Sequence, residues 1–359
     1  MNRVLIVILV TLNFHAYAQE KVLLEKPKVD KRVELLSIVF RLAESPEYSS
    51  QAFKLYTDRI EQHFEKYKKH ELIQFTKSVV NENYVSYDAV MRMAINLDDN
   101  LKLLSDVKDV WQQDQRWNKE NVETFVTLLQ KFYIDTEFDT FFNDNADLYN
   151  EAIKRYTSIY EQIDLDWFHF FYGKEPSEEF SVIIGMGFGG NYGPSLDYTN
   201  GKRTVYSIVG VGMTDDRGMP DFHPMSFIIL VHEFGHSFVN YLIEKNTEEF
   251  KESGERIFSV VKDEMAKQAY GSWMPMLYEA LVRASVIKYA KDHKLMIGND
   301  LVSDFLITDE KENSFFWIEK LVAELENYDK QREVYPTLES YMPKLIEAYK
   351  VWAGNIQNK

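Results

Sequence analysis

The chain has 359 residues and contains 57 Asp and Glu against 41 Lys and Arg, which gives a formal net charge of −16 at pH 7. An acidic surface of this kind repels the phosphates of nucleic acids and of anionic membranes, so nucleic acid is excluded as a partner. The sequence has no Cys, and a chain of this length without disulfides has to be held together by its hydrophobic core.

The first 18 residues have the features of a secretory signal peptide. Arg3 forms a short positive region, an apolar stretch follows from Val4 to Leu12, and Ala16-Tyr17-Ala18 has the small-x-small pattern of a cleavage site. An uncleaved anchor is the alternative, but the apolar stretch is shorter than the ~20 residues of a spanning helix, and no later segment is long and uninterrupted enough. We therefore predict export, cleavage after Ala18 and no stable membrane span.

Residues 19–175 are expected to form an N-terminal helical region. The segment Asp30 to Tyr48 sets the pattern, with Leu35, Val39 and Leu42 at helical spacing and a Pro shortly after them that ends the helix. Similar patterns follow without a repeat period or a low-complexity linker. This region is therefore predicted to pack as one unit with the rest of the chain.

The character of the sequence changes at Phe180. The segments 180–196, FSVIIGMGFGGNYGPSL, and 203–213, RTVYSIVGVGM, are rich in β-branched residues, and Asn200-Gly201 between them is a strong hairpin-turn signal. We predict that the two segments form an antiparallel pair of strands. Helical patterns return after them, so residues 176–359 are predicted to combine a small antiparallel sheet with helices, and the fold class is α+β, mostly helical.

Gly185-x-Gly187-x-x-Gly190 matches the dinucleotide-binding fingerprint. That fingerprint requires a helix directly after it, whose N-terminus holds the pyrophosphate, and a second strand segment follows here instead. The nucleotide interpretation is therefore rejected. Glycines at the end of a strand more often mark a bulge or a close backbone approach, in this case by a peptide.

The segment Ser226 to Ile243 is apolar enough for a core helix, yet it contains His232-Glu233-Phe234-Gly235-His236, the pattern H-E-x-x-H. At about 100° per residue the two His side chains share one face of a helix, and Glu233 projects from the adjoining edge. Two imidazoles can then bind one Zn²⁺ while the carboxylate reaches a water molecule on it. Chance matches to H-E-x-x-H are the alternative, but they usually lie on charged, solvated helices.

The opposite face of this predicted helix is apolar, with Phe227, Leu230, Phe234 and Phe238 along it. The helix is therefore expected to be a core element that carries a polar site on its other side. Gly235 costs about 1 kcal/mol relative to Ala inside a helix, and close packing of a neighbouring element would offset that cost.

A catalytic zinc site of this kind needs a third protein ligand and one open position for water. The extended motif H-E-x-x-H-x-x-G-x-x-H is not present, since Val239 and Leu242 occupy its last two positions. Glu279 is the strongest candidate, because apolar residues surround it in WMPMLYEALVRASVI and a carboxylate there needs a metal or a cation beside it. Arg283, four residues on, offers the alternative of a buried ion pair without a metal, or of a residue that orients Glu279.

H-E-x-x-H with a downstream Glu on a second helix resembles the gluzincin branch of zinc metallopeptidases. The resemblance implies zinc on His232, His236 and Glu279, with Glu233 as the general base. In that branch an Asp often follows the third ligand by four residues and supports the first His. Arg283 stands at that position here, which leaves the residue that orients His232 unassigned.

A larger part of the chain, from VELLSIVFRLAESPEY through HEFGHSFVN to YEALVRA, is similar to an uncharacterised family of secreted Bacteroidota proteins that carry a domain of unknown function with a peptidase-like motif. The similarity implies a periplasmic or extracellular location, and it implies no substrate. In zincin-like folds an edge strand beside the zinc pairs with the peptide, and GGNYGPS, residues 189–195, is the candidate here.

The resulting hypothesis is a secreted zinc metallopeptidase that hydrolyses a peptide or protein substrate through a zinc-activated water. Two alternatives stay open: a non-catalytic envelope binding or structural protein with a polar or zinc-stiffened core, and a zinc hydrolase with a non-peptide substrate. Structural zinc sites often use Cys, so the absence of Cys favours an open, catalytic site. Candidate donors to the developing oxyanion are Tyr278, Tyr192, His223 and Arg283. Their ranking and the oligomeric state are not determined by the sequence.

Overall fold

A computed structural model of the chain describes residues 24–174, 178–268 and 270–356. The predicted signal peptide, residues 1–18, lies outside this part of the chain. Helices make up 62% of the structure, together with a small mixed sheet and a separate two-stranded antiparallel sheet. The predicted class, α+β and mostly helical, is confirmed.

The N-terminal half of the chain is helical, as its apolar periodicity predicts. The side chain of Asp30 caps the N-terminus of the first helix, α1 (Lys31–Leu42), where Leu35, Val39 and Leu42 are all buried. The helices that follow are α2 (Lys54–Phe64), α3 (Glu71–Asn83), α4 (Asp88–Ile95), α5 (Val110–Gln113), α6 (Lys119–Asp135), α7 (Phe138–Asp144), α8 (Ala146–Tyr160) and α9 (Leu165–Tyr172).

Four strands form the mixed sheet, and β4 lies at its centre. The strands are β1 (Glu178–Gly185), β2 (Asn191–Tyr192), β3 (Ser195–Asp197) and β4 (Arg203–Gly210). β1 runs parallel to β4 on one side, whereas β2 and β3 run antiparallel to it on the other. The predicted antiparallel pairing is therefore wrong for the two long strands, and it holds for β3 and β4, the strands on either side of Asn200-Gly201.

The reason lies in the glycine-rich stretch between β1 and β2, where the chain reverses direction inside the segment that the sequence suggested was one strand. A Cβ on Gly210 would lie 2.5 Å from the carbonyl oxygen of Gly190, and a Cβ on Gly189 would lie 3.3 Å from the Cα of Gly212. Only glycines permit backbones to pass this closely. The close approach predicted for this stretch is thus made by the chain itself.

The outer edge of β1 is covered by the first described residues of the chain. Leu24 and Lys28 form parallel bridges to Phe180 and Ile183, and the backbone N–H of Ile184 donates to the carbonyl of Lys28 at 2.8 Å. This segment satisfies backbone groups that an open edge would leave exposed.

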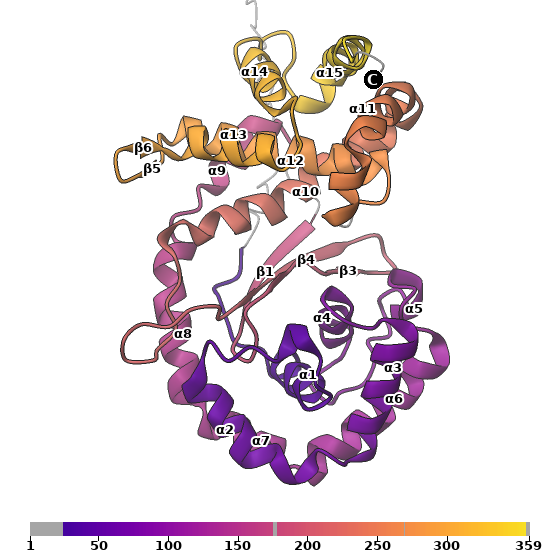
Figure 1. Cartoon of the computed structure of the whole chain (residues 1–359), viewed down its shortest axis with the longest axis vertical. Coiled ribbons are helices and arrows are strands. Elements are labelled where there is room, and N and C mark those ends of the chain that lie inside the picture. Colours follow the sequence, from indigo (N-terminus) through magenta and orange to yellow (C-terminus); the bar gives the residue numbers. More distant parts are fainter. Residues whose placement is uncertain (1–23, 175–177, 269, 357–359) are drawn as a thin grey trace, which may run out of the picture.

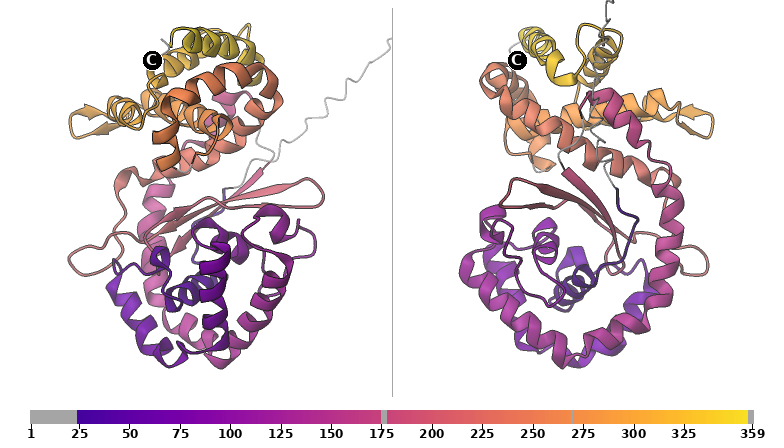
Figure 2. Two further views of the ribbon diagram at one scale, coloured as in Figure 1. Left: turned by 45° about the vertical axis from the view of Figure 1, so that its right-hand side comes forward. Right: turned by 180° about the vertical axis from the view of Figure 1, so that it is seen from behind.

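The C-terminal half of the chain is again helical and lies on the opposite side of the sheet from α1 to α7 (Figures 1 and 2). A two-stranded hairpin projects from it. Its elements are α10 (Phe227–Lys245), α11 (Thr247–Lys267), α12 (Trp273–Asp292), β5 (Met296–Ile297), β6 (Asp300–Leu301), α13 (Val302–Glu312), α14 (Ile318–Asp329) and α15 (Leu338–Gly354).

Helix α10 packs between the sheet and α12. Its apolar face is buried as predicted: Phe227, Leu230, Phe234 and Phe238 are each exposed by 3% or less. Gly235 permits a close approach of α12, since a Cβ at this position would lie 3.3 Å from Cγ1 of Val282. The neighbouring element that the sequence required beside this glycine is therefore α12.

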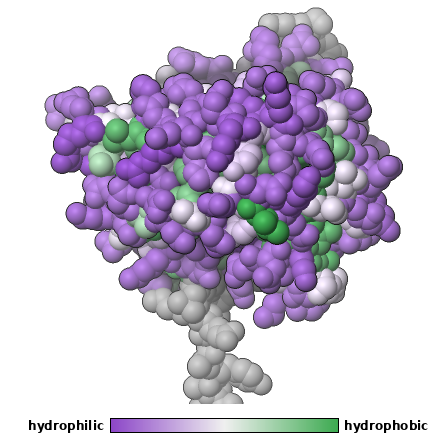
Figure 3. Space-filling view, turned by 90° about the horizontal axis from the view of Figure 1, so that it is seen from below, coloured by the Kyte–Doolittle hydropathy of each residue, from purple (hydrophilic) through white to green (hydrophobic). Residues whose placement is uncertain are grey.

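The face of the molecule seen from below is covered mainly by hydrophilic residues, with small, scattered hydrophobic ones (Figure 3). Within the described residues, no helix is both long and apolar enough to cross a membrane.

Candidate metal centre

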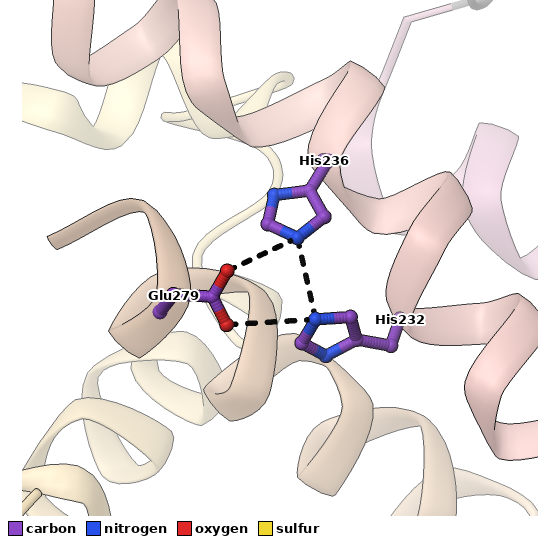
Figure 4. Close-up of side chains that lie close together, drawn as sticks. All are labelled: His232, His236 and Glu279. Carbon is purple, nitrogen blue, oxygen red and sulfur yellow. Dashed lines mark hydrogen bonds and ion pairs between the residues drawn. The ribbon is translucent and has the colours of Figure 1, made fainter. Parts of the chain in front are cut away.

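Three side chains from two neighbouring helices converge on one point (Figure 4). His232 and His236 project from α10, and Glu279 projects toward them from α12. The two Nε2 atoms are 3.2 Å apart, and the carboxylate oxygens of Glu279 lie 3.5 Å from Nε2 of His232 and 3.4 Å from Nε2 of His236. Among the described residues, this is the one cluster of three or more His, Cys, Asp or Glu side chains that could hold a metal ion.

The three separations fit a zinc ion. Two ligand atoms that each lie ~2.0–2.1 Å from one zinc ion at a tetrahedral angle are about 3.3 Å apart, and the observed separations run from 3.2 to 3.5 Å. Two imidazole nitrogens that face each other and a carboxylate all offer lone pairs to the same point. A cation at that point satisfies all three at once.

The charges of the cluster also suit a cation. Burial lowers the pKa of His232 to about 4, so the imidazole is neutral at pH 7 and keeps a lone pair for a metal. Burial alone would raise the pKa of Glu279, but His232, His236 and Arg283 beside it hold that pKa below its usual value. Glu279 is therefore an anion at neutral pH.

Further polar groups fix the orientation of two of these side chains. Nδ1 of His236 lies 3.1 Å from Oδ1 of Asn240, so a proton on Nδ1 leaves Nε2 free as a ligand. Nε of Arg283 donates to Glu279 at 3.3 Å, and Tyr270 hydrogen-bonds to the same carboxylate. The ion pair that the sequence suggested is present, together with the His pair rather than in place of it.

Glu233 lies beside the three donor atoms and faces the sheet. A Cβ on Gly193, which follows β2, would lie 2.1 Å from Oε2 of Glu233. Only a residue without a side chain lets the strand pass this carboxylate so closely. Burial raises the pKa of Glu233, which brings the carboxylate closer to the basicity that proton transfer near neutral pH requires.

A pocket of about 310 Å³ opens next to His232 and Glu233. Its walls come mostly from aliphatic side chains of α10, α12 and α13, and it also has polar residues at several points. The lining residues are Asn191, Ile228, Ile229, His232, Glu233, Arg283, Val286, Ile287, Leu306 and Glu310. The candidate site is therefore accessible to a small group from outside.

Of the four candidate oxyanion donors, Arg283 is the one that lines this pocket. Tyr278 donates to a Glu on α10 at 3.3 Å, and Tyr192 stacks on a Tyr of the N-terminal half. The ring of His223 accepts a hydrogen bond from the backbone two residues on, ahead of α10. The structure adds Asn191, on the sheet edge, to the polar groups of the pocket.

Several residues of the site were missed at the level of sequence. Asn240 follows His236 by four residues, so helical spacing could have identified it. Tyr270 and Glu310 belong to a loop and to α13. Nothing in their local sequence marks them, because their contacts to the site depend on tertiary packing.

The structure defines an α+β protein with a three-donor cluster on two packed helices. The chain belongs to the family with the domain of unknown function DUF4932, whose family model matches residues 26–348. The resemblance to an uncharacterised family is confirmed, and the family description does not include a metal or an activity. Neither the curated proteins nor the solved structures contain a match to the chain.

Proposed function

We propose that this protein is an exported zinc-dependent metallopeptidase. The observation that carries the proposal is the triangle of donor atoms from His232, His236 and Glu279, with separations that suit one zinc ion. Glu233 lies beside the triangle at the mouth of a pocket. Export rests on the predicted signal peptide, and mass spectrometry of the protein from its host should find a mature chain that begins at Gln19.

Zinc held by the three donors supplies Lewis-acid chemistry, which acidifies water and polarises a carbonyl group. Glu233 has the position of a general base, and burial raises its pKa in the direction that this role requires. Its carboxylate takes a proton from water as the water oxygen bonds to the peptide carbonyl carbon. It then returns that proton to the amide nitrogen as the C–N bond breaks, so that a carboxylic acid and an amine are released.

The sheet edge gives an extended peptide a place beside Glu233. The register of β2 and β4 directs the backbone groups of Gly190, Tyr192 and Pro194 toward β4, as the bonds from Gly210 N–H to Gly190 O and from Tyr206 N–H to Pro194 O indicate. The backbone groups of Asn191 and Gly193 consequently face away from β4. Within the part of the chain that the structure describes, they form a short free edge to which a substrate strand can pair.

The alternative of a zinc ion that only stiffens the core is less well supported. Structural zinc sites are closed by four protein ligands, whereas three donors converge among the described residues and a pocket opens beside them. A hydrolase of non-peptide substrates would use the same water chemistry. The choice of test substrate separates these alternatives.

Metal content is the first test. The purified mature protein should contain one zinc per chain by mass spectrometry of metals, and His236→Ala and Glu279→Ala should each lose most of it, since two donors hold zinc much less tightly than three. Zinc that is absent from the wild type after reconstitution, or retained in both variants, contradicts the site.

Peptide cleavage is the second part of the same test. Glu233→Gln should retain its zinc and lose about 10²–10⁴-fold in activity on a peptide library, because the amide cannot accept the proton. Glu244→Gln is the matched control, since Glu244 is exposed on the same helix. A wild-type protein that binds zinc and cleaves no peptide supports a different substrate or a structural metal.

A further inference from the structure

The pocket beside the candidate metal centre has aliphatic walls and a charged end. Ile228 and Ile229 of α10, Val286 and Ile287 of α12 and Leu306 of α13 supply the aliphatic part. Its volume of about 310 Å³ equals roughly ten waters at ~30 Å³ each. This volume lies at the lower end of the range for ligand pockets and is sufficient for one long side chain.

Glu310 is the unusual member of the lining. Only 6% of this residue is exposed, and its Oε2 accepts a hydrogen bond from Nη1 of Arg283 at 2.6 Å. The other oxygen, Oε1, has no hydrogen-bond partner among the described residues. It nevertheless keeps some contact with solvent, unlike the unpaired side-chain atoms that are fully buried, and Glu310 is a lining residue of the pocket.

The charge of Arg283 is already engaged by protein groups, so it offers little free charge to an anion in the pocket. Each of its three nitrogens already donates a hydrogen bond, Nε to Glu279, Nη1 to Glu310 and Nη2 to Tyr270. One guanidinium is thus shared between two carboxylates. An acidic group that entered the pocket would be repelled by the carboxylates of Glu233 and Glu310. A hydrogen-bond donor, in contrast, could pair with the open acceptor on Glu310.

We propose that this pocket selects a substrate side chain with a long aliphatic stem and a cationic end, that is, lysine or arginine. The stem lies against the aliphatic walls, as the methylene groups of Lys and Arg do on apolar surfaces, and the cation donates to Oε1 of Glu310. The net charge of −16 attracts basic peptides to the protein in the same sense. The inference rests on the proposed function, because the pocket opens beside Glu233.

The test compares lysine with norleucine, which has the same aliphatic stem and lacks the ammonium group. Acetylated and amidated peptides of Ala and Ser each carry one of the two residues, placed at each position in turn. Binding to the zinc-loaded Glu233→Gln protein, which does not turn the peptide over, is measured by calorimetry. At one position the lysine peptide should bind about 10–100-fold more tightly, the range of a hydrogen bond between charged groups.

The same measurement on Glu310→Gln in that background should abolish most of the lysine preference. The amide keeps an acceptor for Arg283 and loses the charge, so the variant is expected to fold. Glu312→Gln is the matched control, because Glu312 is exposed near the end of the same helix, and it should leave the preference unchanged. The comparison of the two peptides on the parent protein needs no substitution at Glu310, so the proposal can be tested even if Glu310→Gln does not fold.

Three outcomes each overturn the inference. These are equally tight binding of the norleucine and lysine peptides, a lysine preference that survives Glu310→Gln, and binding of neither peptide. Cleavage of both peptides at equal rates by the wild type overturns it while the proposed function stands. A lysine preference in binding, with no cleavage by the wild type, supports the pocket and contradicts the peptidase.

Discussion

Two glutamates in opposite halves of the molecule have opposite surroundings. Glu34 of α1 is fully buried and receives hydrogen bonds from the backbone N–H of Met186 at 2.8 Å and from the hydroxyl of Tyr56 at 2.7 Å. Both donors are neutral. Glu279 of α12 faces two imidazoles and Arg283, and its cluster adjoins a pocket.

The surroundings move the two acids in opposite directions. Burial raises the pKa of Glu34 to about 7, whereas the His pair and Arg283 overcome burial and keep the pKa of Glu279 low. A carboxyl group among neutral donors and without access to solvent tethers one segment to another, in this case α1 to the chain after β1. A carboxylate that converges with other lone pairs beside a cavity is prepared to hold a cation.

The largest effect is expected on the stability of the fold, through the protonation of Glu34 as the pH changes. Because the folded protein holds the proton of Glu34 more tightly than the unfolded chain does, this group favours folding most below pH 4.5, and its contribution is lost as the pH rises from 4.5 to about 7. The loss amounts to about 3 kcal/mol, given 1.36 kcal/mol per pH unit. Urea unfolding at pH 5 and pH 8 should show it in the wild type.

Glu34→Gln isolates that contribution, since the amide fills the same space and does not titrate. Asp30, whose charge raises the pKa of Glu34, is present in both proteins, as are Tyr56 and Tyr149, which stay protonated in this range. The variant should therefore lose about 2–3 kcal/mol less than the wild type between pH 5 and pH 8, because part of the effect is already lost at pH 5. Identical pH dependence of the two proteins would show that Glu34 is ionised throughout.

The second prediction concerns Asn240, which orients a candidate ligand. Asn240→Ala removes the acceptor 3.1 Å from Nδ1 of His236, and the affinity for zinc should fall by about 10–100-fold. Competition with a chromophoric chelator measures this change. Asn246→Ala, on a residue whose side chain bonds only the backbone of α10, is the control, and an equal loss of affinity in both variants would mean a general effect on the helix.

The smallest effect is expected at the sheet edge. The Cβ of Gly193→Ala would lie 2.1 Å from Oε2 of Glu233, so the carboxylate or the strand must move while the zinc donors stay in place. The contact must lengthen by about 1 Å, and when the carboxylate and the strand share this movement, kcat/KM for a cleaved peptide should fall by about tenfold with zinc content unchanged. Gly354→Ala, where a Cβ meets nothing within 4 Å, should retain full activity. Unchanged kinetics in Gly193→Ala would show that the strand at Gly193 does not affect the reaction at the site.

A contrast between features within one helix and features that join several segments explains what could be predicted from the sequence. The donor triangle was accessible because His232 and His236 share a helix face and because Glu279 is an isolated acid in an apolar helix. The close packing at Gly235 was accessible for a similar reason, since helix energetics make a glycine in a core helix costly. Each of these inferences depends only on residues within one helix.

Features that depend on several segments could not be predicted. The direction of β1 relative to β4 depends on a chain reversal that glycines permit and do not specify. Glu310 belongs to α13, and its role depends on how that helix packs against α12. Glu34 stands in an ordinary helical pattern, and its buried position follows from the contact with Met186, 152 residues further on.

The covering of β1 by the start of the described chain has a consequence for the order of folding. Lys28 bridges to Ile183, and β4, the other neighbour of β1, ends at Gly210. Neither pairing is local, so the sheet closes loops of high entropic cost and should form slowly. The donors of the candidate metal centre all follow the sheet in the chain. A newly made molecule must therefore complete more than three quarters of its 359 residues, through Glu279, before the candidate metal centre can assemble.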